Sequence, residues 1–290
     1  QDDSEVTAGF MWQKTTRESK KYQLRGEILS FIPVDKNVEI MLVTITNTGR
    51  MAQTVTPTAA IPLYGRSADN IRDHRHVTSL LHRIETTDTG VLVTPTLSFD
   101  ERGHQVNHMT YYCVGWSGNG EKPVDFYPTA EDFVGEGGNF ERPYAIVKNA
   151  EGVKAGTKIE GLEAVGGLHF SEITLEPEEE CSYLIFTGIT EDIQEIRNLS
   201  KTYTTREMVL EELEKTKAYW QEKVNVAYHT GDSDFNQFMH WVSFQPILRR
   251  IYGCSFLPHH DYGKGGRGWR DLWQDCLALL MMNPDGVRQM

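Results

Sequence analysis

The sequence lacks the features that mark several broad classes of protein. No uninterrupted apolar run reaches about 18 residues, the length that a membrane-spanning helix needs, so no membrane is predicted as a partner. No run rich in lysine or arginine occurs, and 29 basic against 41 acidic side chains leave a formal net charge of −12, which argues against nucleic acid as a partner. No basic segment followed by an apolar one opens the chain, so the cytoplasm is the predicted location.

Cysteine and the common catalytic motifs are equally scarce. The four cysteines are far apart and form no CxxC pair, so we predict reduced thiols and no zinc site; they are Cys113, Cys181, Cys254 and Cys276. No HExxH or GxSxG motif is present. Adjacent His259 and His260 point in different directions, so with Asp261 they make a poor metal site.

Residues 1–198 are patterned as β-strands. The segment VEIMLVTITNTG, residues 38–49, alternates so that Val38, Ile40 and Leu42 share one face, and it stops at an Asn-Thr-Gly turn. Several similar runs of β-branched and aromatic residues follow, separated by turn residues and with almost no helical periodicity. This pattern predicts an antiparallel β-sandwich, and the absence of βαβ alternation excludes a doubly wound fold.

The pattern then changes to helices. A stripe of Val209, Leu213, Thr216, Trp220 and Val224 predicts an amphipathic helix over 204–224, inside a helical linker of residues 199–230. The next predicted helix, 233–253, is apolar around most of its circumference and contains Pro246. Such a helix is expected to be buried on several sides, as in a helical barrel or large bundle.

A third helix is predicted from Asp271 to about Met282. Residues 231–290 hold too few helices to cover such apolar surfaces, so we expect the segment to begin a helical domain that continues after Met290. The chain is therefore predicted to be one part of a longer polypeptide.

An unusual set of charged and aromatic residues opens the third helix. Asp271 and Asp275 lie four residues apart on one helix face, with Arg270 beside them and Trp269 and Trp273 interleaved. Carboxylates accept hydrogen bonds from vicinal sugar hydroxyls, and a guanidinium donates hydrogen bonds to them. The faces of tryptophan rings pack against the C–H patches of a hexose. The simpler interpretation is that Asp271 caps the helix and pairs with Arg270, which leaves Asp275 unexplained.

The glycine-rich segment GKGGRG, residues 263–268, precedes this helix. Its Lys264 and Arg267 are candidates for contact with an anion such as phosphate, helped by backbone N–H groups. The segment lacks the GxxxxGK[ST] spacing of a P-loop and follows no clear strand, so a nucleotide site is disfavoured.

The segment GRGWRDLWQD, residues 266–275 and here called the signature, resembles the RDxxQD motif of the cellobiose phosphorylase family, glycoside hydrolase family 94. Residues 38–65 resemble the amino-terminal sandwich of that family, which precedes a helical linker and an (α/α)6 barrel. The resemblance implies that residues 231–290 begin such a barrel, truncated here. Within the family, the signature is most similar to that of 1,2-β-oligoglucan phosphorylases.

The resemblance implies an inverting phosphorolysis. Inorganic phosphate would attack the anomeric carbon of a β-linked gluco-oligosaccharide and release α-glucose 1-phosphate, with phosphate as co-substrate and no cofactor. Arg270, Asp271 and Asp275 would hold the transferred glucosyl unit, and Trp269 and Trp273 would shape its pocket. Lys264 or Arg267 is the expected phosphate contact.

The family's general acid is an aspartate further along the barrel, so it is expected after Met290 and this chain alone is expected to be inactive. Its partners would be the oligosaccharide, phosphate and the rest of the same polypeptide, with a homodimer left open. Two alternatives also stay open. One is a carbohydrate-binding module in the sandwich, and the other is a glycan hydrolase or cyclic-glucan synthase domain on the same scaffold.

Overall fold

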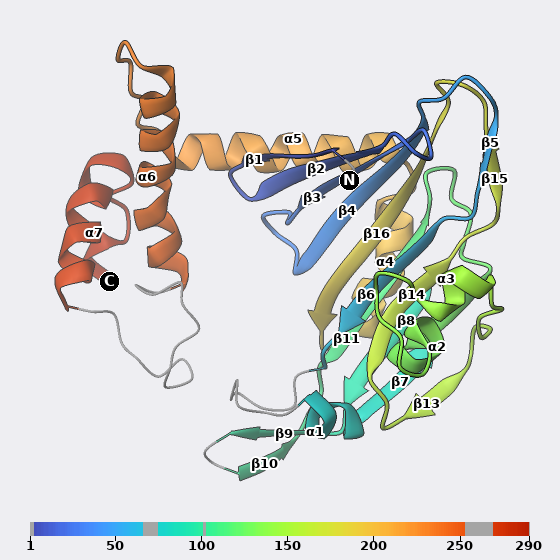
Figure 1. Cartoon of the computed structure of the whole chain (residues 1–290). Coiled ribbons are helices and arrows are strands. Elements are labelled where there is room, and N and C mark those ends of the chain that lie inside the picture. Colours follow the sequence, from blue (N-terminus) through green and yellow to red (C-terminus); the bar gives the residue numbers. More distant parts are fainter. Residues whose placement is uncertain (1–2, 66–74, 101–102, 253–268, 290) are drawn as a thin grey trace. The chain divides into compact units, whose positions relative to one another are not determined.

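A computed structural model describes residues 3–65, 75–100, 103–252 and 269–289. The chain divides into two compact units, Gln1–Leu213 and Glu214–Met290 (Figure 1). The first unit holds the β-strands and the second consists of helices. Of the helices within the described ranges, none is both long and apolar enough to span a bilayer.

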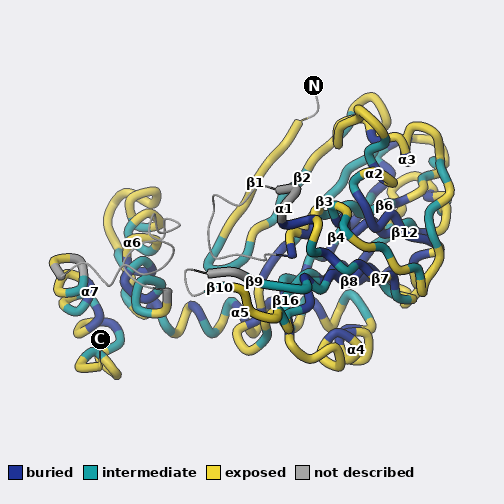
Figure 2. Tube along the Cα trace, turned by 90° about the horizontal axis from the view of Figure 1, so that it is seen from below, coloured by how far each residue is buried: buried dark blue, intermediate teal, exposed yellow. Residues whose placement is uncertain are grey.

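The first unit is built on a large antiparallel sheet. Among the described residues it has nine strands, in the order β1 (Asp3–Gly9), β2 (Trp12–Ser19), β3 (Leu24–Phe31), β4 (Val38–Asn47), β16 (Glu180–Thr190), β11 (Thr110–Ser117), β8 (Gly90–Pro95), β7 (His82–Thr86) and β13 (Lys158–Glu160). The β1–β2 edge is mostly exposed, whereas the central strands are buried (Figure 2). The sequence prediction of a large antiparallel β-structure is therefore confirmed.

Smaller sheets complete the unit. The described strands form a three-stranded sheet of β12 (Asp125–Thr129), β14 (Ala164–His169) and β6 (Thr58–Leu63), and two pairs, β15 (Ile173–Leu175) with β5 (Gln53–Val55) and β10 (Gly103–Val106) with β9 (Leu97–Asp100). The helices of the described chain are α1 (Arg75–Leu80), α2 (Ala130–Val134), α3 (Tyr144–Lys148), α4 (Ile193–Thr202), α5 (Arg206–Lys223), α6 (Ser233–Tyr252) and α7 (Trp269–Met282), and a 3-10 helix covers Val287–Gln289.

Strand β4 follows the alternation that its sequence predicts. Val38, Ile40 and Leu42 are buried, and Met41 and Val43, which alternate with them, are half-buried on the other face. Because successive side chains of a strand point to opposite faces, the two sets enter different cores. The strand ends at Asn47, where the side-chain oxygen accepts the Gly49 backbone N–H (2.9 Å) and closes the predicted turn.

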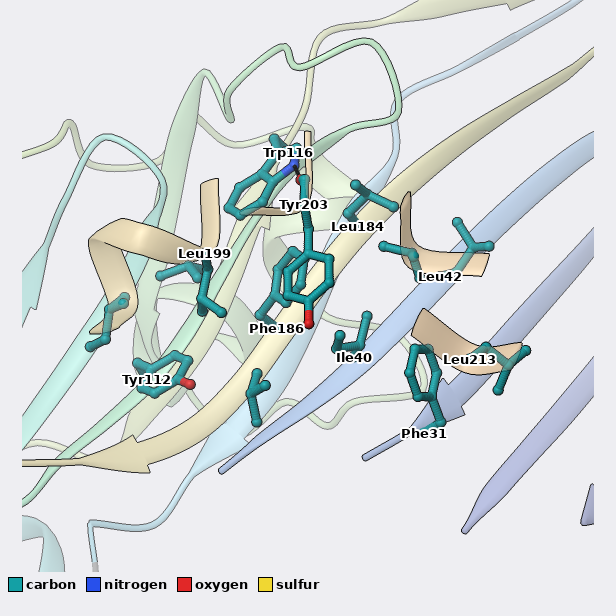
Figure 3. Packing of buried hydrophobic residues seen from close by; sticks show 14 of the residues in the cluster. Phe31, Ile40, Leu42, Tyr112, Trp116, Leu184, Phe186, Leu199, Tyr203 and Leu213 are labelled. Carbon is teal, nitrogen blue, oxygen red and sulfur yellow. Dashed lines mark hydrogen bonds between the residues drawn. The ribbon is translucent and has the colours of Figure 1, made fainter. Parts of the chain in front are cut away.

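Two apolar cores lie on opposite faces of the large sheet. On one face, strand residues such as Ile40, Leu184 and Phe186 pack with Leu199 of α4 and Leu213 of α5 (Figure 3). On the other face, residues of β8, β11 and β16 pack against the three-stranded sheet and its neighbours; they include Val91, Val93, Cys113, Ile185, Phe126 and Leu168. The sandwich is thus covered by helices on one side and by a small sheet on the other.

Residues 1–198 also contain short helices between their strands. Helices α1 to α3 lie between strands of this region, and α4 begins at Ile193. Each of α1 to α3 has five or six residues, fewer than two turns. Such a short segment cannot show the 3.6-residue repeat that identifies a helix in a sequence.

Helix α6 lies in the second unit and contains Pro246. Phe244 and Ile247 are buried, while Phe235, Phe238 and Ile251 are exposed. Within the described residues the helix is therefore buried on one side only, in contrast to the several sides expected from its composition.

The thiol of Cys113 is fully buried between the sheets, and burial raises its pKa to about 12 because the thiolate would be desolvated. We expect iodoacetamide at pH 8 to leave Cys113 unmodified in the folded protein, because the thiol stays protonated and inaccessible. The partly exposed Cys276 should be alkylated under the same conditions. Mass spectrometry of tryptic peptides with and without urea measures both. Equal labelling of the two cysteines without urea would contradict this burial.

Candidate functional site

The predicted site residues fall on α7 and on the segment before it. The side chains of Arg270, Trp273 and Asp275 belong to the described part of the structure. The side chains of Trp269 and Asp271 lie outside it, as do Lys264 and Arg267. Within the signature, the structure therefore shows the side chains of Arg270 and of residues 272–275.

Helix α7 forms because its sequence, WRDLWQDCLALLMM, is free of β-branched residues and rich in leucine and methionine, which favour helix. Asp275, Leu279 and Met282 are its buried described residues. Their spacing of four and three residues places them on one helix face. Asp275 is thus part of the face that packs inward, and only 2% of its surface is exposed.

Asp275 is held there by Arg249 of α6. The Arg249 Nε donates to both Asp275 carboxylate oxygens at 2.9 Å, and Nη2 donates to Oδ1 at 2.6 Å. The Arg249 side chain is 30% exposed, so one end of this ion pair reaches solvent and the other does not. Charge-assisted bonds in this forked geometry are among the stronger polar contacts in proteins.

Sequence reasoning missed Arg249. The available signal was a pair of arginines, Arg249 and Arg250, in the last turn of an otherwise apolar helix. The second arginine binds the segment that follows α7, because Arg250 Nη1 donates to the carbonyl oxygens of Asn283 (3.2 Å) and Asp285 (3.1 Å). Arg249 therefore joins α6 to α7, and Arg250 joins α6 to the segment after α7.

Arg270 and Trp273 lie on a different face of α7 from Asp275. Arg270 is exposed, and 57% of the Trp273 surface is exposed. Trp273 and the exposed Leu277 are four residues apart and share that face. The structure therefore does not gather Arg270, Trp273 and Asp275 on one side of the helix.

The exposed face of α7 offers an aromatic ring and a guanidinium to a ligand, while the buried face offers a carboxylate already engaged by Arg249. A carboxylate has about four acceptor positions, so the three N–H bonds to Asp275 leave room for one more donor. A sugar contact at Asp275 stays a prediction.

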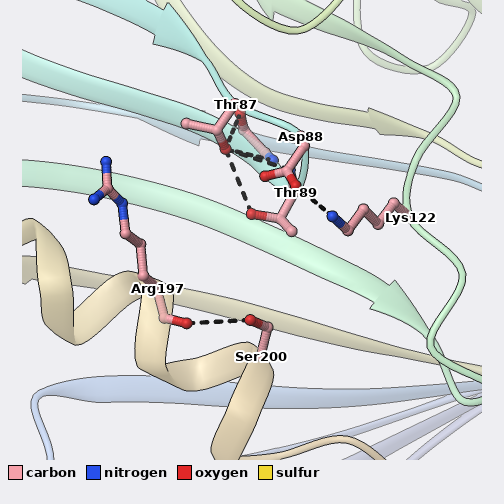
Figure 4. A network of polar contacts seen from close by, with 7 residues as sticks. Thr87, Asp88, Thr89, Lys122, Arg197 and Ser200 are labelled. Atoms are coloured by element: carbon pink, nitrogen blue, oxygen red, sulfur yellow. Dashed lines mark hydrogen bonds and ion pairs between the residues drawn. The ribbon is translucent and has the colours of Figure 1, made fainter.

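Polar clusters in the sandwich unit have simpler roles. Thr87 Oγ1 accepts the backbone N–H groups of Thr89 (3.3 Å) and Gly90 (3.1 Å), and the Lys122 ammonium pairs with Asp88 (Figure 4). These contacts hold the turn between β7 and β8.

Across the described residues, no group of three or more His, Cys, Asp or Glu side chains is placed to hold a metal ion.

Similarity to known proteins supports one family. Residues 1–206 match the model for "Glycosyl hydrolase 94, supersandwich domain". The chain is also 23% identical, over 95% of its length, to a 3-O-β-D-glucopyranosyl-β-D-glucuronide phosphorylase from Paenibacillus borealis. It spans about a third (33%) of the length of that curated relative.

Two solved structures show a distant resemblance to the chain. A bacterial glucoamylase complexed with acarbose has a TM-score of 0.45 at 9% identity, over 77% of this chain and 30% of that one. A family GH92 α-mannosidase from Bacteroides thetaiotaomicron has a TM-score of 0.37 at 9% identity, over 84% and 28%. Scores this low support no conclusion about fold or function.

The family match, in contrast, covers residues 1–206, which is most of the chain. The chain therefore belongs to the glycosyl hydrolase 94 family through its supersandwich domain.

Proposed function

We propose that the chain is the sandwich, linker and first barrel helices of an inverting glycoside phosphorylase acting on β-linked gluco-oligosaccharides. The observation that carries the proposal is the signature, whose residues 269–275 lie on α7, in a chain whose sandwich belongs to the glycosyl hydrolase 94 family. The similarity to a curated phosphorylase points to the same reaction class.

In the proposed reaction a phosphate oxygen forms a bond to the anomeric carbon as the glycosidic C–O bond breaks on the opposite side. An acid, expected beyond Met290, gives its proton to the leaving oxygen. Phosphate is itself the nucleophile, so no carboxylate is needed to activate water, unlike in an inverting hydrolase. The products are α-glucose 1-phosphate and a shortened glucan.

The residues of this chain would bind and orient rather than transfer protons. Arg270 and Trp273, exposed on α7, would contact the glucosyl unit together with Trp269 and Asp271. Asp275 would accept a sugar hydroxyl on its remaining acceptor position, held in place by Arg249. Lys264 or Arg267 would contact phosphate, and no cofactor is required.

The decisive test is the phosphate dependence of product formation. A full-length protein that contains this chain should release glucose 1-phosphate from a β-1,2-glucooligosaccharide only when inorganic phosphate is present. Release of free glucose without phosphate would instead support the hydrolase alternative and overturn the proposal. Parallel assays with β-1,3-linked substrates test the second candidate linkage, which the name of the Paenibacillus borealis relative suggests.

The binding-module alternative makes a different prediction. It requires that glycans bind to the sandwich alone, so Arg270→Ala in α7 should leave that binding unchanged. Under the phosphorylase proposal the same substitution removes a contact to the transferred glucosyl unit. We then expect kcat/KM of the full-length protein to fall by about tenfold or more, the usual effect of losing a charged hydrogen bond.

A further inference from the structure

A hollow runs along one edge of β6 in the sandwich unit. Its volume is about 270 Å³, and it lies between β6 and side chains of β3, β4 and β16 in the large sheet. Residues 57–61, which include most of β6, all line it. Because successive side chains of a strand point to opposite faces, a hollow lined by five consecutive residues lies beside the edge of that strand.

Strand β6 is the outer strand of the three-stranded sheet, and within the described residues it pairs with β14 alone. The backbone N–H of Phe170 donates to the Pro57 carbonyl at 3.0 Å. In an antiparallel pair, every second residue of a strand exchanges hydrogen bonds with the same neighbour. Ala59 and Ile61 therefore bond to β14, and the residues that alternate with them direct their backbone groups toward the other edge.

The residues that face this second edge are Thr58, Ala60 and Pro62. Their backbone groups have no hydrogen-bond partner within the described residues. Pro62 has no N–H, and proline occurs in a sheet where its nitrogen faces an open edge. The edge therefore presents the N–H groups of Thr58 and Ala60 and the carbonyls of all three residues, at the spacing that an added strand requires.

The wall opposite β6 is apolar. Met41, Val43 and Ile45 of β4 are half-buried on one face of the large sheet and line the hollow. Ile28 of β3 lies directly opposite Val43 in the strand register, and 43% of its surface is exposed. No charged side chain is among the described residues that line the hollow. A neutral occupant with apolar side chains therefore matches this wall, because a buried charge would find no partner there.

The two walls together indicate what kind of occupant fits. Regularly spaced backbone donors and acceptors on one side match an extended peptide, and the apolar wall matches its side chains. Apolar interfaces without charges, similar to a divided domain core, are typical of permanent partners rather than transient ones. The chain spans 33% of the length of its curated relative, so a longer polypeptide of that kind has further segments that could supply a strand.

We infer that a β-strand of the longer polypeptide, from outside residues 1–290, pairs with the open edge of β6 and places apolar side chains over Met41, Val43 and Ile45. This strand extends the three-stranded sheet and covers part of the large sheet that the three strands leave exposed. The inference rests on the proposal that the chain belongs to a longer polypeptide, and it does not depend on the reaction which that polypeptide catalyses. Its test therefore measures no turnover.

The test compares amide hydrogen exchange along β6 in the 290-residue chain and in the full-length protein, resolved to single residues by mass spectrometry with electron-transfer fragmentation. In the 290-residue chain, the amides of Thr58 and Ala60 should exchange fast, because they face an open edge. In the full-length protein we expect both to exchange about 100-fold more slowly or more, because the added strand accepts their hydrogen bonds. The amides of Ala59 and Ile61 are controls within the same strand and should be protected in both proteins, since they donate to β14.

A proline substitution tests the pairing directly. Ala60→Pro removes an N–H that faces the hollow and leaves the hydrogen bonds to β14 in place, so the 290-residue variant should fold and keep the Ala59 and Ile61 amides protected. In the full-length protein, the same variant should speed exchange at Thr58 by about fivefold to tenfold, the usual effect of one lost hydrogen bond. Ala60→Ser keeps the N–H and is the matched control, with exchange at Thr58 unchanged.

Four outcomes would overturn the inference. Equally fast exchange at Thr58 and Ala60 in both proteins would mean that no strand of the longer polypeptide pairs with this edge. Slow exchange already in the 290-residue chain would mean that the chain's own residues cover it. Protection in the full-length protein that depends on protein concentration would assign the edge to a second copy. Unchanged exchange at Thr58 in full-length Ala60→Pro would mean that the protection does not come from strand pairing.

Discussion

Replacing Phe186 by alanine is expected to lower the free energy of unfolding of the sandwich unit by about 3–5 kcal/mol. The Phe186 ring is fully buried and stacks on Trp116 with centroids 4.7 Å apart and on Tyr203 at 5.6 Å. Trp116 in turn donates its Nε1–H to the Tyr203 carbonyl at 2.9 Å, so its own position is fixed. The cavity left by the ring therefore cannot close by a simple movement of its neighbours.

Denaturation by urea, followed by the far-ultraviolet circular dichroism of the β-sheet, measures this effect. The matched control is Phe140→Ala, because Phe140 is 45% exposed and contacts Phe133 at a ring distance of 5.8 Å. The control substitution should lower the free energy of unfolding by less than about 1 kcal/mol, since little apolar surface is lost from the interior. Similar losses in the two variants would show that the ring stack adds nothing to stability beyond an ordinary surface contact.

The alternation of buried and half-buried side chains along β4 was predictable, because the two-residue period of a strand is visible in the strand's own sequence. The run MTYYCVGW, residues 109–116, which contains most of β11, shows where local information ends. Tyr111 and Tyr112 are adjacent and point to opposite faces of β11, yet Tyr112 is almost fully buried and Tyr111 is not. Which tyrosine is covered depends on α4, whose sequence is about 80 residues away. The sequence therefore predicts the strand, and the packing of distant elements decides what each face contacts.

The candidate site shows the same division. A helix beginning near Asp271 followed from the apolar pattern, and α7 is observed there. The pairing of Asp275 with Arg249 connects two residues 26 positions apart in the sequence and depends on how α6 packs against α7. A pattern of charges within one helix cannot reveal that contact.

Substituting Asp275 by asparagine should destabilise the helical unit by about 2–3 kcal/mol. Removing one member of a buried ion pair leaves the other charge without compensation, which costs about 3–5 kcal/mol where both groups are fully buried. Arg249 is 30% exposed, so water can solvate part of its charge and the cost is smaller. Hydrogen exchange at the amides of α6 and α7 measures the loss directly. Asp285→Asn is the matched control, because Arg250 contacts the backbone carbonyl of Asp285 and a change in its exposed side chain should cost less than about 0.5 kcal/mol.

A double substitution separates this structural role of Asp275 from the proposed contact with sugar. Arg249→Met combined with Asp275→Leu removes both charges and keeps the space filled, and such replacements are often neutral or stabilising. We expect it to restore protection of α6 and α7 to near the wild-type level. In the full-length protein the same variant should still lose activity if Asp275 accepts a sugar hydroxyl, because leucine offers no acceptor. Recovery of both protection and activity would mean that Asp275 only joins α7 to α6, and the sugar would then be bound by other residues of the signature.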